Sequence, residues 1–176
     1  MRMNSKTKIV LDSDVVIHFI KGNCFSLLLD IFPEYQYLIL DVVYAELAKS
    51  TQTKTLIDNV SHHMASKLLR VDFNPSGSMM KEYALLLKTF GKGESACMVY
   101  CKSNRDVLGS SNLKDIKAYC ESNGITYLTT IDFLYYAYLR KKMSKQECDA
   151  FIQEVIAKGS KLPMIDISHY ACSVII

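Results

Sequence analysis

Three acidic residues stand where the chain passes into a helical pattern. Asp12 follows the short apolar run 8–11, Glu46 lies in the helical pattern after the apolar run 37–40, and Glu94 directly follows a Gly-Lys-Gly sequence. Carboxylates placed at strand ends and helix starts can converge on one hard cation such as Mg²⁺ or Mn²⁺, which takes oxygen ligands and keeps several waters. Such a cation lowers the pKa of a bound water and offsets negative charge that develops on a phosphodiester.

Each of these carboxylates also has an ordinary interpretation. Most charged side chains are simply solvated surface residues. Glu46 and Glu94 could be exposed helix residues, and Asp12 could be a helix cap. The order and context of the three residues favour a common site over three separate surface roles.

Short apolar runs alternate with helical patterns along the whole chain, which predicts an α/β fold. Strands are expected at 8–11, 37–40, 68–73, 106–109 and 125–128. This alternation implies parallel pairing with helices on both faces, and hence a three-layer α/β/α sandwich around a mainly parallel, roughly five-stranded sheet. Sites in such folds form beyond the carboxyl ends of the strands, where the strand order reverses.

Capping signals place several helix ends. Thr130 is expected to cap a helix over 131–143, and Ser144 with Glu147 has the spacing of a capping box. Gly124 is expected to end the helix before it in the left-handed conformation. The segment 163–167 is expected to add a short edge strand.

The length of 176 residues suits one domain, 1–176, with a core over about 8–158 and a C-terminal tail over 159–176. A net charge of +3 does not by itself indicate a nucleic-acid binder. The six scattered cysteines lack zinc-site spacing and are expected to be free thiols in a reducing compartment. Neither a signal peptide nor a membrane span is evident, so a cytoplasmic location is expected.

Four segments, in order, carry a resemblance to a known family. They are Ile-Val-Leu-Asp-Ser-Asp-Val-Val-Ile at 9–17, Val-Val-Tyr-Ala-Glu-Leu at 42–47, Gly-Lys-Gly-Glu-Ser-Ala at 91–96, and Asn-Gly-Ile-Thr-Tyr-Leu-Thr-Thr at 123–130. With these motifs, the chain resembles PIN-domain proteins over about residues 8–158. Each motif is weak alone, whereas four in the right order are moderately specific.

The resemblance implies a small α/β nuclease fold and cleavage of RNA that depends on Mg²⁺ or Mn²⁺. Many bacterial relatives are toxins of toxin–antitoxin pairs, so it also implies a small antitoxin protein as partner and a homodimer. By position, Asp12, Glu46 and Glu94 match three acidic residues of the family, with Asp12 and Glu94 as principal ligands and Glu46 supporting the metal or a water. Thr130 matches a hydroxyl residue near the site that positions a carboxylate or a water.

The chain departs from the family after its fourth expected strand, where one or two aspartates are usual and Ser110-Ser111-Asn112 stands instead. Asn112 keeps the shape of aspartate without its charge, and Ser111 can only hydrogen-bond a metal-bound water. A site with fewer carboxylates should bind a cation more weakly. Three other aspartates could substitute for the missing charge, namely Asp14, Asp115 and Asp132. A catalytically impaired PIN-like module that binds RNA or protein is therefore the alternative function.

Two further features have competing interpretations. Tyr135, Tyr136 and Tyr138 precede Arg140-Lys141-Lys142, a combination that could clamp single-stranded RNA. The favoured alternative is a helix with an apolar core face and cations at its end, where the helix dipole stabilises positive charge. His18 lies on an apolar helix face and is expected to be a buried residue with its hydrogen bonds satisfied.

Overall fold

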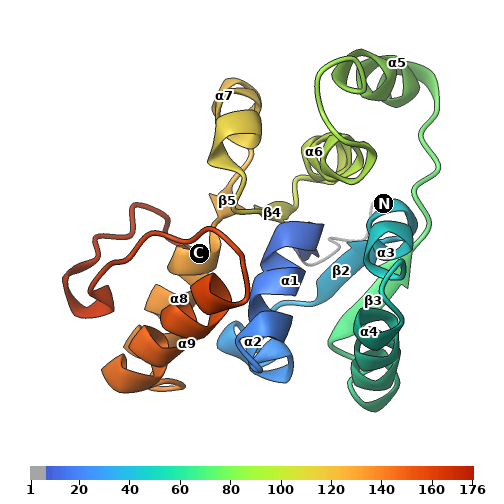
Figure 1. Ribbon diagram of the computed structural model, residues 1–176. Coiled ribbons are helices and arrows are strands. Elements are labelled where there is room, and N and C mark those ends of the chain that lie inside the picture. The colour runs from blue at the N-terminus through green and yellow to red at the C-terminus, as the bar shows by residue number, and fades with distance from the viewer. Residues whose placement is uncertain (1–6) are drawn as a thin grey trace.

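Five short strands form one sheet in the order β3-β2-β1-β4-β5 in the computed structural model, which describes residues 7–176 (Figure 1). Residues 1–6, which the sequence assigns to the same domain, lie outside the described residues. All four strand pairings are parallel. The strands are β1 (Ile9–Leu11), β2 (Tyr37–Leu40), β3 (Leu68–Val71), β4 (Val107–Gly109) and β5 (Tyr127–Leu128). The expected α/β class and parallel sheet are thus confirmed.

Helices connect the strands and cover both faces of the sheet, as Figure 1 shows. Helices α5, α6 and α7 lie on one side of the sheet in that view, and α1, α2, α4, α8 and α9 lie on the other. In chain order the helices are α1 (Ser13–Lys21), α2 (Phe25–Ile31), α3 (Asp41–Leu47), α4 (Thr51–His63), α5 (Gly77–Leu86), α6 (Lys92–Asn104), α7 (Leu113–Asn123), α8 (Thr130–Leu139), α9 (Lys145–Ala157) and the 3₁₀ helix η1 (Ile167–His169). The arrangement is the expected three-layer α/β/α sandwich.

The strand order reverses between β1 and β4. The chain builds β1, β2 and β3 toward one edge of the sheet, then returns to the other side of β1 to add β4 and β5. The ladder continues one residue past each central strand, because the Asp12 N–H donates to the Gly109 carbonyl at 2.8 Å and the Ser110 N–H donates to the Leu128 carbonyl at 3.0 Å. Asp12 and Ser110 therefore stand side by side where such folds place their sites.

Continuous burial of the central strands explains why their sequences are unbroken apolar runs. Every residue of β1, β2 and β4 is buried, as expected for strands covered by helices on both faces. Phe19 and Phe133 pack edge to face beside them, with ring centroids 6.1 Å apart. This packed layer fixes the backbone from which the first polar residues after β1 and β4 emerge.

Helix α8 begins one residue earlier than the sequence indicates. Its cap is Thr129, whose hydroxyl accepts from the Asp132 N–H while the Asp132 carboxylate accepts from the Thr129 N–H. Thr130 is therefore the first helical residue, and its hydroxyl is available for other contacts. The helix also ends at Leu139 rather than Met143, because Lys141 takes a left-handed conformation with φ of 56°.

Other expectations about helix ends and the tail have mixed outcomes. The capping box of Ser144 and Glu147 is present, and Gly124 ends α7 with φ of 63°. The expected edge strand at 163–167 is wrong, since residues 163–166 form no strand and lead into η1, which packs against α8 and α9. Within residues 7–176, no helix has both the length and the apolar character that crossing a bilayer requires.

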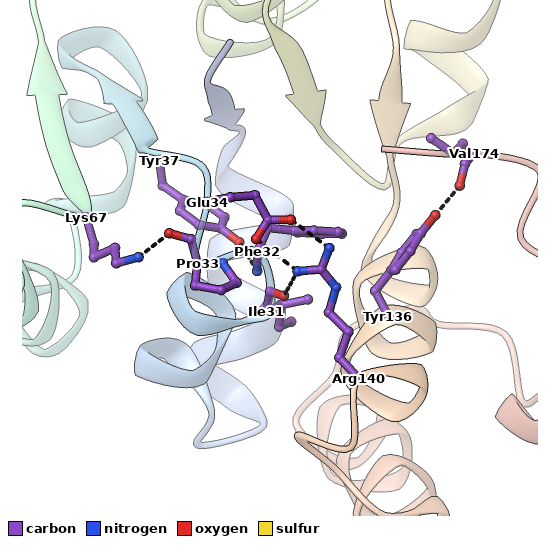
Figure 2. Close-up of polar contacts among 9 residues, drawn as sticks. All are labelled: Ile31, Phe32, Pro33, Glu34, Tyr37, Lys67, Tyr136, Arg140 and Val174. Atoms are coloured by element: carbon purple, nitrogen blue, oxygen red, sulfur yellow. Dashed lines mark hydrogen bonds and ion pairs between the residues drawn. The ribbon is translucent and has the colours of Figure 1, made fainter. Parts of the chain in front are cut away.

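Two of the cations that follow Tyr135, Tyr136 and Tyr138 form contacts within the fold. The Arg140 guanidinium donates to both carboxylate oxygens of Glu34, at 2.7 and 3.0 Å, and to the Ile31 carbonyl at 2.9 Å (Figure 2). It also lies 4.7 Å from the centre of the Phe32 ring. Lys142 pairs with Asp30 at 2.6 Å. These contacts attach the end of α8 to α2 and the following loop, which favours the structural interpretation over an RNA clamp.

Candidate functional site

Two aspartates share one hydroxyl at the point where the strand order reverses. The Ser110 hydroxyl lies 3.2 Å from the Asp12 carboxylate and 3.5 Å from that of Asp14. Asp12 caps α1 by accepting from the Ser13 N–H at 2.8 Å, and it is buried with 4% of its surface exposed. Since a hydroxyl carries one proton, Ser110 can donate to only one of the two carboxylates at a time.

Asp14 connects the start of α1 to the loop after β4. One carboxylate oxygen accepts from the Val15 N–H at 2.6 Å, and the other accepts from the Ser111 N–H at 2.7 Å. Both are charge-assisted hydrogen bonds to backbone, which fix the orientation of the carboxylate. The sequence-predicted substitute Asp14 therefore lies beside Asp12.

Glu94 faces the same region from α6, through Asn112. The Asn112 amide donates to Glu94 at 2.9 Å and to Asp115 at 2.7 Å. Asn112 thus lies between two carboxylates and uses both of its N–H bonds to hold them. Asp115, another of the possible substitutes, therefore lies close to Glu94 through Asn112.

Glu46 is held against the first turn of α6. Its carboxylate accepts from the Gly93 N–H at 3.1 Å. A Cβ at position 93 would lie 2.8 Å from Glu46 Oε2, so the absence of a side chain there allows the contact. Gly93, the residue before Glu94, therefore allows Glu46 to lie close to the start of α6.

Asp132 is directed elsewhere. Its carboxylate caps α8 through Thr129 and accepts from the Tyr170 hydroxyl at 2.7 Å and from the Cys172 thiol at 3.2 Å. Of the residues selected from sequence, it is the one whose hydrogen bonds tie the C-terminal tail to α8 rather than to the Asp12–Asp14–Ser110 group.

A chain of side-chain hydroxyls adjoins the carboxylates. The Ser111 hydroxyl lies 2.7 Å from Thr130 Oγ1 and also accepts from the Thr130 N–H at 2.7 Å. Thr130 Oγ1 in turn lies 2.8 Å from Nδ1 of His18. Ser110, Gly93 and His18 were not selected as site residues from sequence. Of these three residues, Ser110 alone carried a usable signal in the sequence, namely its position directly after a buried strand.

Crowding of the acids changes their protonation. Burial raises the pKa of Asp12 from 3.8 to about 7, with repulsion from Asp14 and then Glu94 adding to it. Burial likewise raises the pKa of Asp14. The pKa of Glu94 rises from 4.5 to about 7 through burial, then repulsion from Asp115 and Asp14. A cation between these groups would oppose all of these effects.

The donor set is chemically suited to a hard divalent cation. Its members are carboxylate, amide and hydroxyl oxygens, which Mg²⁺ and Mn²⁺ prefer. In the described range 7–176, however, no three His, Cys, Asp or Glu side chains are already grouped as metal ligands. Asn112 takes one place near Glu94 where a carboxylate would complete such a group. The residues therefore fit a cation in chemistry, although these side chains are not grouped as its ligands in this structure.

The raised pKa values predict that the metal-free protein loses stability as pH rises. A carboxyl whose pKa is higher in the folded state than in the unfolded one binds more protons when folded, so unfolding becomes easier between the two values. For Asp12 this window runs from about 4 to about 7. We expect the melting temperature in EDTA to fall by about 5 °C between pH 5.5 and 7.5, and Mn²⁺ to restore it.

The control for this pH effect is Asp12→Asn, which removes the titrating group. Differential scanning fluorimetry of both proteins checks it. An equal fall in melting temperature in the variant would show that Asp12 is not the source.

The parallel sheet and its helical layers form a PIN-like fold. Two solved structures are similar to this chain. One is a chain of VapBC2 from Rickettsia felis, crystallised bound to a DNA fragment from its promoter, with 18% identity, a TM-score of 0.53, and coverage of 70% of this chain and 98% of that one. The other is a chain of DNA-bound VapBC from Salmonella typhimurium, with 15% identity, a TM-score of 0.53, and coverage of 71% and 99%.

At these identities the likeness establishes the fold alone. No family model matches the sequence, and no curated protein matches it either. The PIN-like resemblance seen in the motifs is thus confirmed at the level of fold.

Proposed function

We propose that this chain is a PIN-type endoribonuclease dependent on Mg²⁺ or Mn²⁺, acting in the cytoplasm as the toxin of a toxin–antitoxin pair. One observation carries the proposal: Asp12 and Asp14 at the start of α1 and Glu94 in the first turn of α6 lie close enough to repel one another where the strand order reverses. Burying repelling acids costs stability, so the arrangement makes most sense if a cation binds there. The similarity in fold to VapBC chains supports the toxin role.

The residues would divide the work as follows. Asp12 and Glu94 would hold the cation, with Asp14 completing the charge and Ser110 hydrogen-bonding whichever carboxylate is ionised. A bound Mg²⁺ or Mn²⁺ supplies Lewis-acid activation of water and neutralises charge on the phosphodiester. Glu46, fixed by the Gly93 N–H, would orient the attacking water and accept its proton.

Lysines beside the carboxylates support a polyanionic substrate. Lys49, Lys92 and Lys114 are exposed and lie within three residues of Glu46, Glu94 and Asn112 respectively. Within residues 7–176, none of these three lysines forms an ion pair. Ammonium groups that reach the acidic centre from these positions would bind the phosphates on either side of the cleaved bond.

An exposed apolar surface supports the protein partners. Helix α5 has no buried residue, and in and beside it Met80, Leu85 and Leu87 are 47%, 61% and 39% exposed. Large apolar side chains exposed on one short helix can contribute to an interaction surface. We propose that an antitoxin or the second subunit of a homodimer covers them.

Replacing Gly93 with alanine tests the role of Glu46. The new Cβ would displace the flexible Glu46 carboxylate while alanine favours the helix, so we expect cleavage to fall about tenfold with the melting temperature unchanged or higher. Gly91→Ala is the matched control, because a Cβ at position 91 meets nothing within 4 Å. Equal cleavage by the two variants would remove Glu46 from the proposal.

The direct test uses end-labelled single-stranded RNA. We expect the purified protein to cut it with Mn²⁺ and to leave it intact with EDTA. Calorimetry with Mn²⁺ should show binding to one site per chain. An absence of both cleavage and Mn²⁺ binding would overturn the proposed function.

A non-catalytic module that binds RNA or protein is the second candidate. The observation in its favour is Asn112, whose amide satisfies Glu94 and Asp115 without a cation. Such a protein would bind labelled RNA equally well in EDTA and would not cut it.

A further inference from the structure

Three contacts between side chains and backbone link His18 to the Asp14 carboxylate, and helix α1, which carries both residues, closes them into a ring. Asp14 and His18 are four residues apart, so they lie on the same face of α1. From Asp14 the ring passes to the Ser111 N–H at 2.7 Å, from the Ser111 hydroxyl to Thr130 at 2.7 Å, and from Thr130 to His18 at 2.8 Å. The ring therefore joins α1, the loop after β4 and the first turn of α8.

His18 and Thr130 are buried, whereas Ser111 and Asp14 are half-buried, so the contact between His18 and Thr130 has little freedom to exchange with water. Thr130 is fully buried and His18 is 7% exposed. Burial, followed by repulsion from Lys21, lowers the pKa of His18 to about 4, which leaves a neutral imidazole at neutral pH. A neutral imidazole has one nitrogen that accepts a hydrogen bond. We assign Nδ1 as the accepting nitrogen, so that the Ser111 hydroxyl donates to Thr130 and the Thr130 hydroxyl donates to His18.

This donor order restricts Ser111. Its hydroxyl accepts from the Thr130 N–H and donates to Thr130 Oγ1, while its backbone N–H donates to Asp14. Without an acceptor at His18, the Thr130 hydroxyl would have to turn toward Ser111 and displace the Ser111 proton. Ser111 would then rotate, and its N–H would move relative to the Asp14 carboxylate.

We propose that His18 is a positioning residue, which acts through Thr130 and Ser111 to hold the Asp14 carboxylate beside Asp12. The catalytic consequence rests on the proposed function, whereas the positioning itself does not. A buried histidine that merely satisfies its own hydrogen bond would stabilise the fold without affecting Asp14. The two roles therefore predict different results.

His18→Phe and His18→Asn separate these roles. Phenylalanine keeps an aromatic side chain of similar size but has no hydrogen-bond acceptor. In asparagine, the side-chain oxygen can occupy the position of Nδ1. We expect the Ser111 amide proton in the NMR spectrum to shift upfield in His18→Phe, because its bond to Asp14 lengthens, and to stay near its wild-type position in His18→Asn. An unchanged Ser111 amide in His18→Phe would overturn the proposal, whatever the protein's activity.

Kinetics give the second readout. In His18→Phe we expect kcat for RNA to fall about tenfold with little change in KM, and in His18→Asn to stay within about threefold of wild type. In a Thr130→Val background, where the ring is already broken, His18→Phe should have almost no further effect on kcat. Independent effects of the two substitutions would contradict the relay.

Tyr37→Phe controls for the loss of a buried hydrogen bond elsewhere. Its hydroxyl accepts from the Phe32 N–H at 3.2 Å, in the group of contacts drawn in Figure 2. We expect this variant to melt earlier with kcat and the Ser111 amide unchanged. If the wild-type protein cuts no RNA, the proposed function fails, and the Ser111 amide still decides whether His18 positions Asp14.

Discussion

Asp12→Asn is expected to lower Mn²⁺-dependent RNA cleavage by about 10³-fold while raising the melting temperature of the metal-free protein. Asn keeps the shape of Asp, so the Ser13 N–H can still find an acceptor. The substitution removes the negative charge that a cation needs, and losing one main electrostatic group of a site costs about 10²–10³ in rate or more. It also removes the repulsion from Asp14 and Glu94, which is the source of the gain in stability.

The measurements are initial cleavage rates, Mn²⁺ calorimetry and thermal melting at pH 7.5. Asp106→Asn is the matched control, because Asp106 is also a buried aspartate next to a central strand, with 6% of its surface exposed. It precedes β4 and accepts from the Lys8 N–H at 2.8 Å. Asp106 therefore lies at the amino-terminal ends of the strands, opposite to Asp12. We expect Asp106→Asn to keep its cleavage activity. Cleavage by Asp12→Asn at the wild-type rate would mean that a contaminating nuclease or another centre is responsible.

The sheet and the convergence of acids were predictable because both follow from short-range patterns. Runs such as Ile9–Leu11 and Tyr37–Leu40 are apolar throughout, as strands buried on both faces must be. Once the strands are placed and paired in parallel, topology brings the residue after β1 next to the residue after β4. Asp12 and the Ser110–Asn112 segment could thus be assigned to one region before any contact was known.

The remaining features depend on tertiary packing that no local pattern encodes. Thr129 and Thr130 are identical side chains in sequence, and only the reciprocal bond with Asp132 decides that the first one caps α8. Glu46 reaches Gly93 from a helix 47 positions earlier in the chain. His18 looks like an ordinary core residue in α1 until α8 brings Thr130 to it. In each case the partner is distant in sequence, so its identity emerges only from the fold.

The low identity to the VapBC chains has a related physical explanation. Apolar core residues can be exchanged for others of similar volume while the layers and strand order persist. A fold can therefore match at a TM-score of 0.53 with 18% identity. Four short motifs could therefore predict this fold although no family model matches the sequence. Asn112 stands where the sequence analysis expects an aspartate, which makes it the most informative residue to change.

Asn112→Asp is expected to strengthen Mn²⁺ binding at least tenfold and to increase RNA cleavage. The amide of Asn112 now donates to Glu94 and Asp115. A carboxylate there would repel both, so the metal-free variant should melt earlier than wild type at pH 7.5. A bound cation would reverse this repulsion, because affinity for a hard cation rises with the charge of its ligands. Mn²⁺ calorimetry, melting with and without Mn²⁺, and cleavage rates check the three effects.

Asn104→Asp is the control, since the Asn104 amide donates to the Tyr100 carbonyl at the far end of α6. It makes the same change of charge outside the site and should leave Mn²⁺ affinity unchanged. A large gain in cleavage by Asn112→Asp alone would identify a nuclease weakened at one ligand position. If Asn112→Asp binds Mn²⁺ no more tightly than wild type and neither protein cuts RNA, the acids at β1 and α6 are not a cation site. The PIN-like fold then serves binding alone.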